Sequence, residues 1–161
     1  MQVAIMNLFD VRESIIVTNV SKQMALVPFE TDVLVLRKNG YAYGFEIKTS
    51  LSDLKADFKK AQHKSVYVNE FGNIVGLQKY FGKFRKFYFA VPYNLKDAAL
   101  ELLPNHIGLY VLYLGDNEEN VFKLEKEGSV ISNYNWTDSE KFELARLGTM
   151  RIKGLLQKLA K

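Results

Sequence analysis

Acidic and basic side chains alternate with apolar ones in a stretch that ends at Lys48. Glu46 and Lys48 stand two residues apart at the end of this apolar run. Because side chains alternate between the two faces of a β-strand, this pair shares one face while Phe45 and Ile47 share the other. The preceding apolar run carries Asp32 in the same alternation. Two acids and a lysine can therefore converge where the two strands meet.

Such a cluster suits a hard divalent cation, Mg²⁺ or Mn²⁺. Magnesium takes one or two carboxylates, keeps several waters and accepts phosphate oxygens. A lysine beside the cation could orient or activate a water, or neutralise charge that builds on a phosphate. The alternative is a partly exposed cross-strand charge cluster, which contributes little to stability. The residues alone leave both interpretations open.

The hairpin between the two runs decides whether the acids meet. A two-residue loop would turn Asp32 away from Glu46, onto the opposite face. A three-residue loop that ends at Gly40, with this glycine in the left-handed conformation, would place Asp32 opposite Glu46 and Glu30 opposite Lys48. The sequence permits both loops. A metal site requires the longer one, or a bulge elsewhere.

The pattern of Asp32 followed by Glu46-Ile47-Lys48, with a helix opening at residues 49–50, resembles the PD-(D/E)xK nuclease superfamily. The resemblance is more specific to its MmcB-like branch, which is described as DNA-repair-related. It covers roughly residues 15–114, and residues 144–156 also look similar to that group. The segments that carry the narrower resemblance are 45–50, 53–60 and 86–92.

This resemblance implies a magnesium-dependent DNA phosphodiesterase, either an endo- or an exodeoxyribonuclease, with a restriction-endonuclease-like core. It makes Asp32, Glu46 and the carbonyl of Ile47 the metal ligands. By the same resemblance Asp32, Glu46 and Lys48 are the catalytic residues, and Lys48 is the catalytic lysine. The expected partner is DNA.

Two further acids are candidates for the same site. In some members of the superfamily an early helix adds an acid, for which Glu13 is the nearby candidate. The first acid of the superfamily often follows a proline, whereas here Pro28 lies four residues before Asp32 with Glu30 between them. Glu30 therefore either assists or replaces Asp32.

Positive charge is concentrated in the middle of the chain. The net charge is +4, but residues 54–87 hold eight Lys or Arg against two acids, a local net charge of +6. Such a patch beside an acid cluster indicates a polyanion-binding surface, although a solvated face of a mildly basic protein has the same composition. The DNA-binding candidates are Lys55, Lys59, Lys60, His63, Lys64, Lys79, Lys83 and Arg85.

Residues 69–86 mix glycines, aromatics and basic residues, which suits a loop that stacks on bases. The alternative is that these aromatics belong to the core.

The 161 residues suit one nuclease-like domain, with its core at about 15–114 and a C-terminal helical segment at about 137–161. The chain has no cysteine, which excludes disulfides and thiolate zinc sites, and no apolar run approaches a membrane span. We therefore expect a cytoplasmic protein with no membrane partner.

The remaining pattern predicts an α/β fold, with a mixed central sheet flanked by helices. We expect a short helix within residues 1–14 that carries Leu8 and Val11, and a helix capped by Asn94. Predicted strands cover 15–20, 87–91 and 108–114, with an edge strand at 120–124. A capping box at Thr137 opens a last helix, broken near Gly148. Its expected core residues are Leu144, Leu147, Ile152, Leu155 and Leu156.

Two other functions fit the acid cluster and the basic middle segment. One is a nuclease-fold protein that binds DNA without cutting it, and the other is an interaction domain outside nucleic-acid chemistry.

Overall fold

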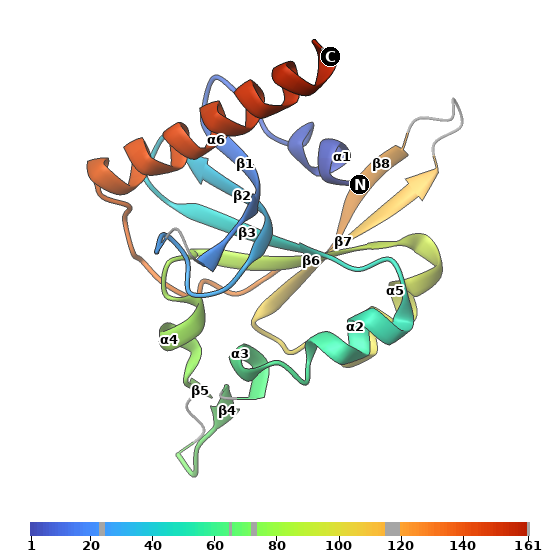
Figure 1. The fold of residues 1–161 in the computed structure, drawn as a ribbon. Helices are drawn as coiled ribbons and strands as arrows, with labels where there is room; N and C mark the ends of the chain where they lie inside the picture. Colours follow the sequence, from blue (N-terminus) through green and yellow to red (C-terminus); the bar gives the residue numbers. More distant parts are fainter. Residues whose placement is uncertain (23–24, 65, 72–73, 115–119, 161) are drawn as a thin grey trace.

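The computed structural model describes residues 1–22, 25–64, 66–71, 74–114 and 120–160. Its centre is a six-stranded mixed sheet of order β1-β2-β3-β6-β7-β8, accompanied by a small hairpin, β4-β5 (Figure 1). The strands are β1 (Ser14–Val20), β2 (Thr31–Arg37), β3 (Ala42–Ile47), β4 (Tyr67–Val68), β5 (Ile74–Val75), β6 (Lys86–Pro92), β7 (Ile107–Leu114) and β8 (Asn120–Lys126). The helices are α1 (Gln2–Met6), α2 (Leu51–Asp57), α3 (Ala61–Lys64), α4 (Leu77–Phe81), α5 (Lys96–Leu102) and α6 (Asp138–Leu159), with a 3₁₀ turn, η2 (Tyr93–Leu95). The predicted α/β class and mixed sheet are confirmed.

The middle of the sheet is parallel and its outer pairs are antiparallel. β6 pairs in parallel with both β3 and β7, whereas β1–β2, β2–β3 and β7–β8 are antiparallel. The helix α5 lies in the connection between the parallel strands β6 and β7, and the predicted edge strand β8 is present. Phe87 to Val91 are buried in the central strand β6. Because β2 and β3 are antiparallel, the carboxyl end of β3 and the amino end of β2 lie side by side at one end of these strands.

The β2–β3 hairpin has the longer of the two loops considered. Arg37 N–H donates to the Tyr41 carbonyl at 2.9 Å, so three residues, ending in Gly40, form the loop. Gly40 has φ of +83°, the left-handed region that favours glycine. The ladder pairs Val33 with Phe45, and the same register continued by one residue places Asp32 opposite Glu46. The register that a metal site requires is therefore the register that forms.

Two hydrophobic clusters fill the two faces of the sheet. The larger contains buried side chains from four helices, represented by Leu54 of α2, Phe81 of α4, Ala99 of α5 and Leu144 of α6. The smaller, on the opposite face, contains Ile5 of α1. Alternation along β2 and β3 places Asp32 and Glu46 on the face with four helices, because their neighbours Val33 and Phe45 lie in the smaller cluster. No helix in the described ranges is both long enough and apolar enough to cross a bilayer.

Several predicted boundaries were wrong, each for a local reason. The first helix ends at Met6 with Asn7 as its C-cap, and a turn follows in which the Asp10 side chain accepts the Arg12 N–H at 2.8 Å. Leu8 and Val11 are therefore exposed, and Ile5 is buried instead. Asn94 is not a helix cap. It lies inside the turn η2 that follows Pro92, and the N-cap of α5 is Leu95, with no side-chain cap.

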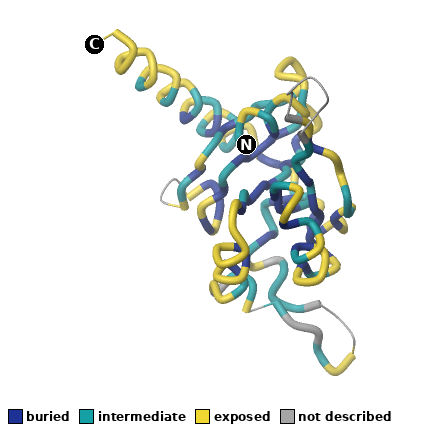
Figure 2. The backbone as a smooth tube through the Cα atoms, turned by 90° about the vertical axis from the view of Figure 1, so that its right-hand side faces the viewer, coloured by how far each residue is buried: buried dark blue, intermediate teal, exposed yellow. Residues whose placement is uncertain are grey.

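The last helix also differs from the prediction. Its capping box at Thr137 is confirmed, but α6 runs without a break through Gly148, since a single glycine costs a long helix only about 1 kcal/mol. Leu144 and Leu147 are buried as expected. The second half extends beyond the body (Figure 2), so Ile152, Leu155 and Leu156 are about 60% exposed rather than in the core.

The segment 69–86 forms part of the core rather than an open loop. It contains the strand β5 and the helix α4, and its Phe81 and Phe84 are fully buried. Phe29 packs against both rings, with centroids 5.2 and 5.9 Å away. Phe71, by contrast, is exposed. The core interpretation therefore holds for these two phenylalanines.

The start of α6 provides a pH-dependent anchor. The Glu140 carboxylate accepts the Thr137 N–H at 2.8 Å and the Tyr134 hydroxyl at 3.0 Å, and it is paired with Lys83. Burial opposes its charge, but the bonds from Lys83 and Thr137 lower the pKa of Glu140 to about 2. Its contribution to stability is therefore complete above the unfolded pKa, about pH 4.5, and is lost as the pH falls toward 2.

We expect Glu140→Gln to lower the free energy of unfolding by about 1–2 kcal/mol at pH 7, because the charge-assisted cap is lost. Urea unfolding measured between pH 7 and pH 2.5 should show this difference shrink as the pH falls. Glu143→Gln is the matched control on the same helix, since Glu143 pairs with exposed Arg146, and it should leave stability unchanged. A Glu140 effect that stays constant with pH would contradict the assignment.

Candidate active site

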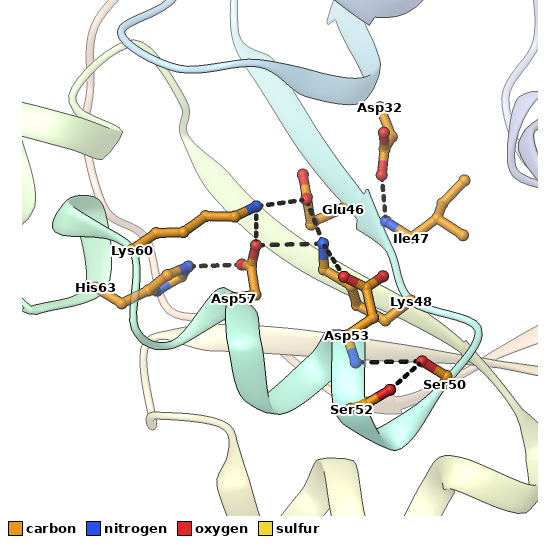
Figure 3. Close-up of polar contacts among 10 residues, drawn as sticks. All are labelled: Asp32, Glu46, Ile47, Lys48, Ser50, Ser52, Asp53, Asp57, Lys60 and His63. Atoms are coloured by element: carbon orange, nitrogen blue, oxygen red, sulfur yellow. Dashed lines mark hydrogen bonds and ion pairs between the residues drawn. The ribbon is translucent and has the colours of Figure 1, made fainter.

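Lys48 lies at the centre of a buried charge cluster at the carboxyl end of β3. It is 4% exposed, and its Nζ lies 2.6 Å from Oε1 of Glu46 and 3.2 Å from Oδ1 of Asp57. The Asp53 carboxylate is farther away, at 3.9 Å. Figure 3 shows Glu46 reaching the ammonium from β3, and both aspartates reaching it from α2. The Glu46 and Lys48 side chains thus meet, as the strand alternation predicts.

Asp57 connects this cluster to the next helix. It is 1% exposed; its Oδ1 contacts the ammonium groups of Lys48 and Lys60, and its Oδ2 lies 2.9 Å from Nε2 of His63. Lys60 also approaches Oε1 of Glu46, at 3.6 Å. The His63 ring is enclosed by aromatic side chains, with the Phe81 ring centroid 5.8 Å away. Asp57 therefore fixes the positions of two cations and one imidazole.

Local sequence explains why α2 delivers these acids. Ser50 is the N-cap, and its hydroxyl accepts the Asp53 N–H at 3.2 Å. Leu54 and Phe58 pack on the sheet, so Asp57, three residues after Leu54, faces inward with them. Asp53 precedes Leu54 and remains half exposed at the rim.

Asp32 acts on the backbone of β3 rather than on Lys48. Its Oδ2 accepts the N–H of Ile47 at 2.7 Å. The regular ladder between β2 and β3 ends at the Val33–Phe45 pair, so the Asp32 side chain takes the place that a backbone carbonyl would otherwise fill. In an antiparallel strand the N–H and C=O of one residue point to the same side. The Ile47 carbonyl therefore points toward Asp32.

Burial shifts the ionisation of the two candidate ligands in the same direction. Burial, reinforced by the nearby charge of Asp32, raises the pKa of Glu46 to about 7, despite the hydrogen bond from Lys48. Burial likewise raises the pKa of Asp32, although the Ile47 N–H opposes this. A cation next to these carboxylates would favour their charged forms.

For Lys48 and Asp57, neighbouring charges outweigh burial and favour the charged forms. Burial opposes the charge on Lys48, but Glu46 and Asp57 outweigh it and raise the pKa of the ammonium. Burial also opposes the charge on Asp57, but His63, Lys60 and Lys48 lower the pKa of this carboxyl well below its ordinary range. Lys48 is therefore a firmly held cation and Asp57 a firmly held anion.

Two carboxylates and one backbone carbonyl are the candidate ligands for magnesium or manganese. Lys48 and Lys60 both contact Oε1 of Glu46, and Asp32 uses Oδ2, so the described contacts leave Oε2 of Glu46 and Oδ1 of Asp32 for a cation. Among the described residues, no three His, Cys, Asp or Glu side chains form a set that could hold a metal ion. A cation would thus take two carboxylates and the Ile47 carbonyl, with water and substrate phosphate filling the other positions, as magnesium commonly does.

The two additional acids are placed differently. Glu30 lies just before β2 and is exposed, with its charge close enough to affect the pKa of Asp32. Glu13 lies just before β1, beside the Arg37 end of β2, where it pairs with Lys38 at 3.4 Å. This is the opposite end of the sheet from Asp32. The structure therefore does not bring Glu13 into the cluster.

The basic candidates divide into two groups. Lys55, Lys59, Lys64 and Lys79 are exposed. The others are engaged within the protein: His63 is nearly buried against Asp57, Lys60 joins the acid cluster, Lys83 pairs with Glu140, and Arg85 donates to Asn133 at 2.6 Å. The expected phosphate contact by His63 does not fit its buried position.

Sequence reasoning missed the roles of Asp57 and Lys60 in the cluster. The usable signal was an aspartate on the apolar face of α2, next to Leu54 and Phe58, since a carboxylate on a buried helix face requires a partner. Lys60, three residues after Asp57, was the cation at the spacing that places two side chains on one helix face.

Comparison with known proteins shows a similarity of fold. No family model and no curated protein matches the chain. The structure resembles that of SPO1766, a protein of unknown function from Silicibacter pomeroyi, with a TM-score of 0.55 and 18% sequence identity. The match covers 94% of this chain and 82% of that protein. At this identity the likeness concerns the α/β fold alone.

Proposed function

We propose that this chain is a metal-dependent nuclease that hydrolyses phosphodiester bonds in DNA, with a restriction-endonuclease-like core. The observations that support it best are the contact of Glu46 with the buried Lys48 and the hydrogen bond that Asp32 accepts from the Ile47 N–H on the same strand end. The resemblance to the MmcB-like branch of the PD-(D/E)xK nucleases supports the same function. It also suggests a role in DNA repair or phage DNA metabolism.

The residues divide the work as follows. Asp32, Glu46 and the Ile47 carbonyl would hold Mg²⁺ or Mn²⁺, which when bound polarises a phosphate oxygen and lowers the pKa of its water ligands. Lys48 stays an ammonium, because its pKa is raised. It therefore donates hydrogen bonds that orient a water and offsets negative charge developing on the phosphate, rather than accepting a proton.

Exposed lysines next to this cluster would hold the DNA backbone. Lys55 and Lys59 lie on or just after α2, and Lys64 ends α3. α2 also carries Asp57 into the cluster, and the turn between α2 and α3 carries Lys60, so a strand held by the lysines passes close to the candidate metal ligands. Contacts of this kind position the backbone without reading sequence.

The direct test is a gel assay with plasmid, single-stranded and branched DNA, each incubated with the full chain and either Mg²⁺ or EDTA. We expect cleavage of at least one substrate with Mg²⁺ and none with EDTA. Asp32→Asn keeps an acceptor for the Ile47 N–H but removes the charge, so this variant should be folded and inactive.

The outcomes separate the three functions. Binding of DNA without cleavage, in Mg²⁺ and in Mn²⁺, would favour a nuclease-fold protein that only binds DNA. Absence of binding even at low salt would favour an interaction domain. Cleavage that persists in the Asp32→Asn variant would contradict Asp32 as a required metal ligand.

A further inference from the structure

A second candidate binding site lies on the same face of the sheet as the acid cluster. It is an open pocket of about 670 Å³ between the segment that precedes β2, the end of α4 and the segment that precedes α6. This volume falls within the range of small-molecule sites. Its wall includes Leu26, Val27 and Pro28 on one side and Lys79, Ser132 and Tyr134 on the other.

The lining combines an apolar surface with a cation. Leu26, Val27 and Pro28 provide the apolar side. Lys83 also lines the pocket, but its charge is matched by Glu140 and its Nζ lies 4.0 Å above the Tyr134 ring. Lys79 is exposed at the rim. A ligand that matches this lining has a flat, largely apolar body and a negative charge at one end.

Residues on both sides of the pocket are close to the acid cluster, either in sequence or through side-chain contacts. On one side, Pro28 is four residues from Asp32, so their Cα atoms lie at most about 14 Å apart. On the other side, Phe81 of α4 precedes the lining residue Gly82. The Phe81 ring centroid lies 5.8 Å from that of His63, which contacts Asp57. A DNA strand advances at least about 3.4 Å per nucleotide, so at most about four nucleotides span the distance from Asp32 to the pocket.

We propose that this pocket binds one unpaired nucleotide of the DNA strand whose backbone passes the acid cluster. The base lies against the apolar wall and Tyr134, and Lys79 contacts the adjoining phosphate. A paired base is stacked inside a duplex and cannot enter, whereas an unpaired base can leave the stack. The substrate class is therefore DNA with a single-stranded segment. This inference rests on the proposed function for the identity of the strand.

The test uses binding by the full chain in EDTA, so cleavage plays no part. Fluorescence anisotropy compares a short single-stranded oligonucleotide with the duplex of the same sequence. Pro28→Trp places bulk in the pocket at an exposed residue, and Lys79→Ala removes the rim cation. We expect each variant to weaken single-strand binding at least about fivefold and to change duplex binding by less than twofold. The matched control is Lys158→Ala, an exposed lysine in the last turn of α6, which should change neither.

NMR titration locates the ligand directly. Thymidine monophosphate should shift the backbone amides of Gly82, Ser132 and Tyr134, whereas inorganic phosphate should affect Lys79 and its neighbours alone. Equal loss of single-strand and duplex binding in Pro28→Trp, or unchanged amides at saturating oligonucleotide, would overturn the pocket assignment. These binding results are independent of hydrolysis. If the chain shows them but does not cleave DNA, the pocket assignment stands and the proposed nuclease function fails. If the chain cleaves DNA but does not show them, the nuclease function stands and the pocket assignment fails.

Discussion

Replacing Glu46 with glutamine is expected to lower the rate of Mg²⁺-dependent DNA cleavage by about 100-fold or more, with the free energy of unfolding within about 1 kcal/mol of wild type. The amide has the same shape and still accepts a hydrogen bond from Lys48, so packing is retained. It provides no charge for a cation. Burial already disfavours the carboxylate, since the pKa of Glu46 is raised to about 7, so little stability depends on the charge that is removed.

Initial cleavage rates and urea unfolding of the same preparations provide the two measurements. Glu101→Gln is the matched control, an exposed residue of α5, and should leave both unchanged. Glu30→Gln tests whether the exposed acid beside Asp32 assists: a loss close to that of Glu46→Gln would make it a further ligand. Full activity of Glu46→Gln would remove this residue from the site.

The part of the site that follows from strand geometry could be predicted from the sequence. A period of two fixes which side chains share a face, so Glu46 and Lys48 had to meet once β3 formed. The relation of Asp32 to Glu46 depends on one loop residue, because a shift of one position turns every side chain of a strand to the other face. The sequence permitted both loops, and the left-handed Gly40 is the feature that selects the longer one.

The helical contribution to the site could not be predicted in the same way. Asp57 lies eleven residues beyond Glu46, and only the packing of α2 on the sheet brings its carboxylate to Lys48. Similarly, the leucines of the distal part of α6 have the spacing of core residues, yet the body ends before the helix does. Periodicity identifies which face of a helix is apolar but does not show what, if anything, lies against it.

Replacing Asp57 with alanine is expected to have the largest effect on stability, a loss of about 3–5 kcal/mol in the free energy of unfolding at pH 7. The variant leaves Lys48 buried with Glu46 as its remaining close acid, and His63 loses its hydrogen-bond acceptor. The matched control is Asp53→Ala on the same helix. Asp53 is half exposed and 3.9 Å from Lys48, so it should cost no more than about 1 kcal/mol.

A double variant separates the buried charge from simple packing. If the cost of Asp57→Ala comes from an uncompensated ammonium, then adding Lys48→Met should recover part of the lost stability, because the remaining buried charge is removed as well. If the cost comes from a cavity, the second change should add to it.

The stabilisation that Asp57 contributes in the wild-type protein should also decrease in acid. The pKa of Asp57 is lowered in the folded state, so this stabilisation is lost as the pH falls below the unfolded value near 4. An Asp57→Ala variant as stable as the control would mean that Lys48 is held by Glu46 alone, and the network would then have no role in positioning the lysine.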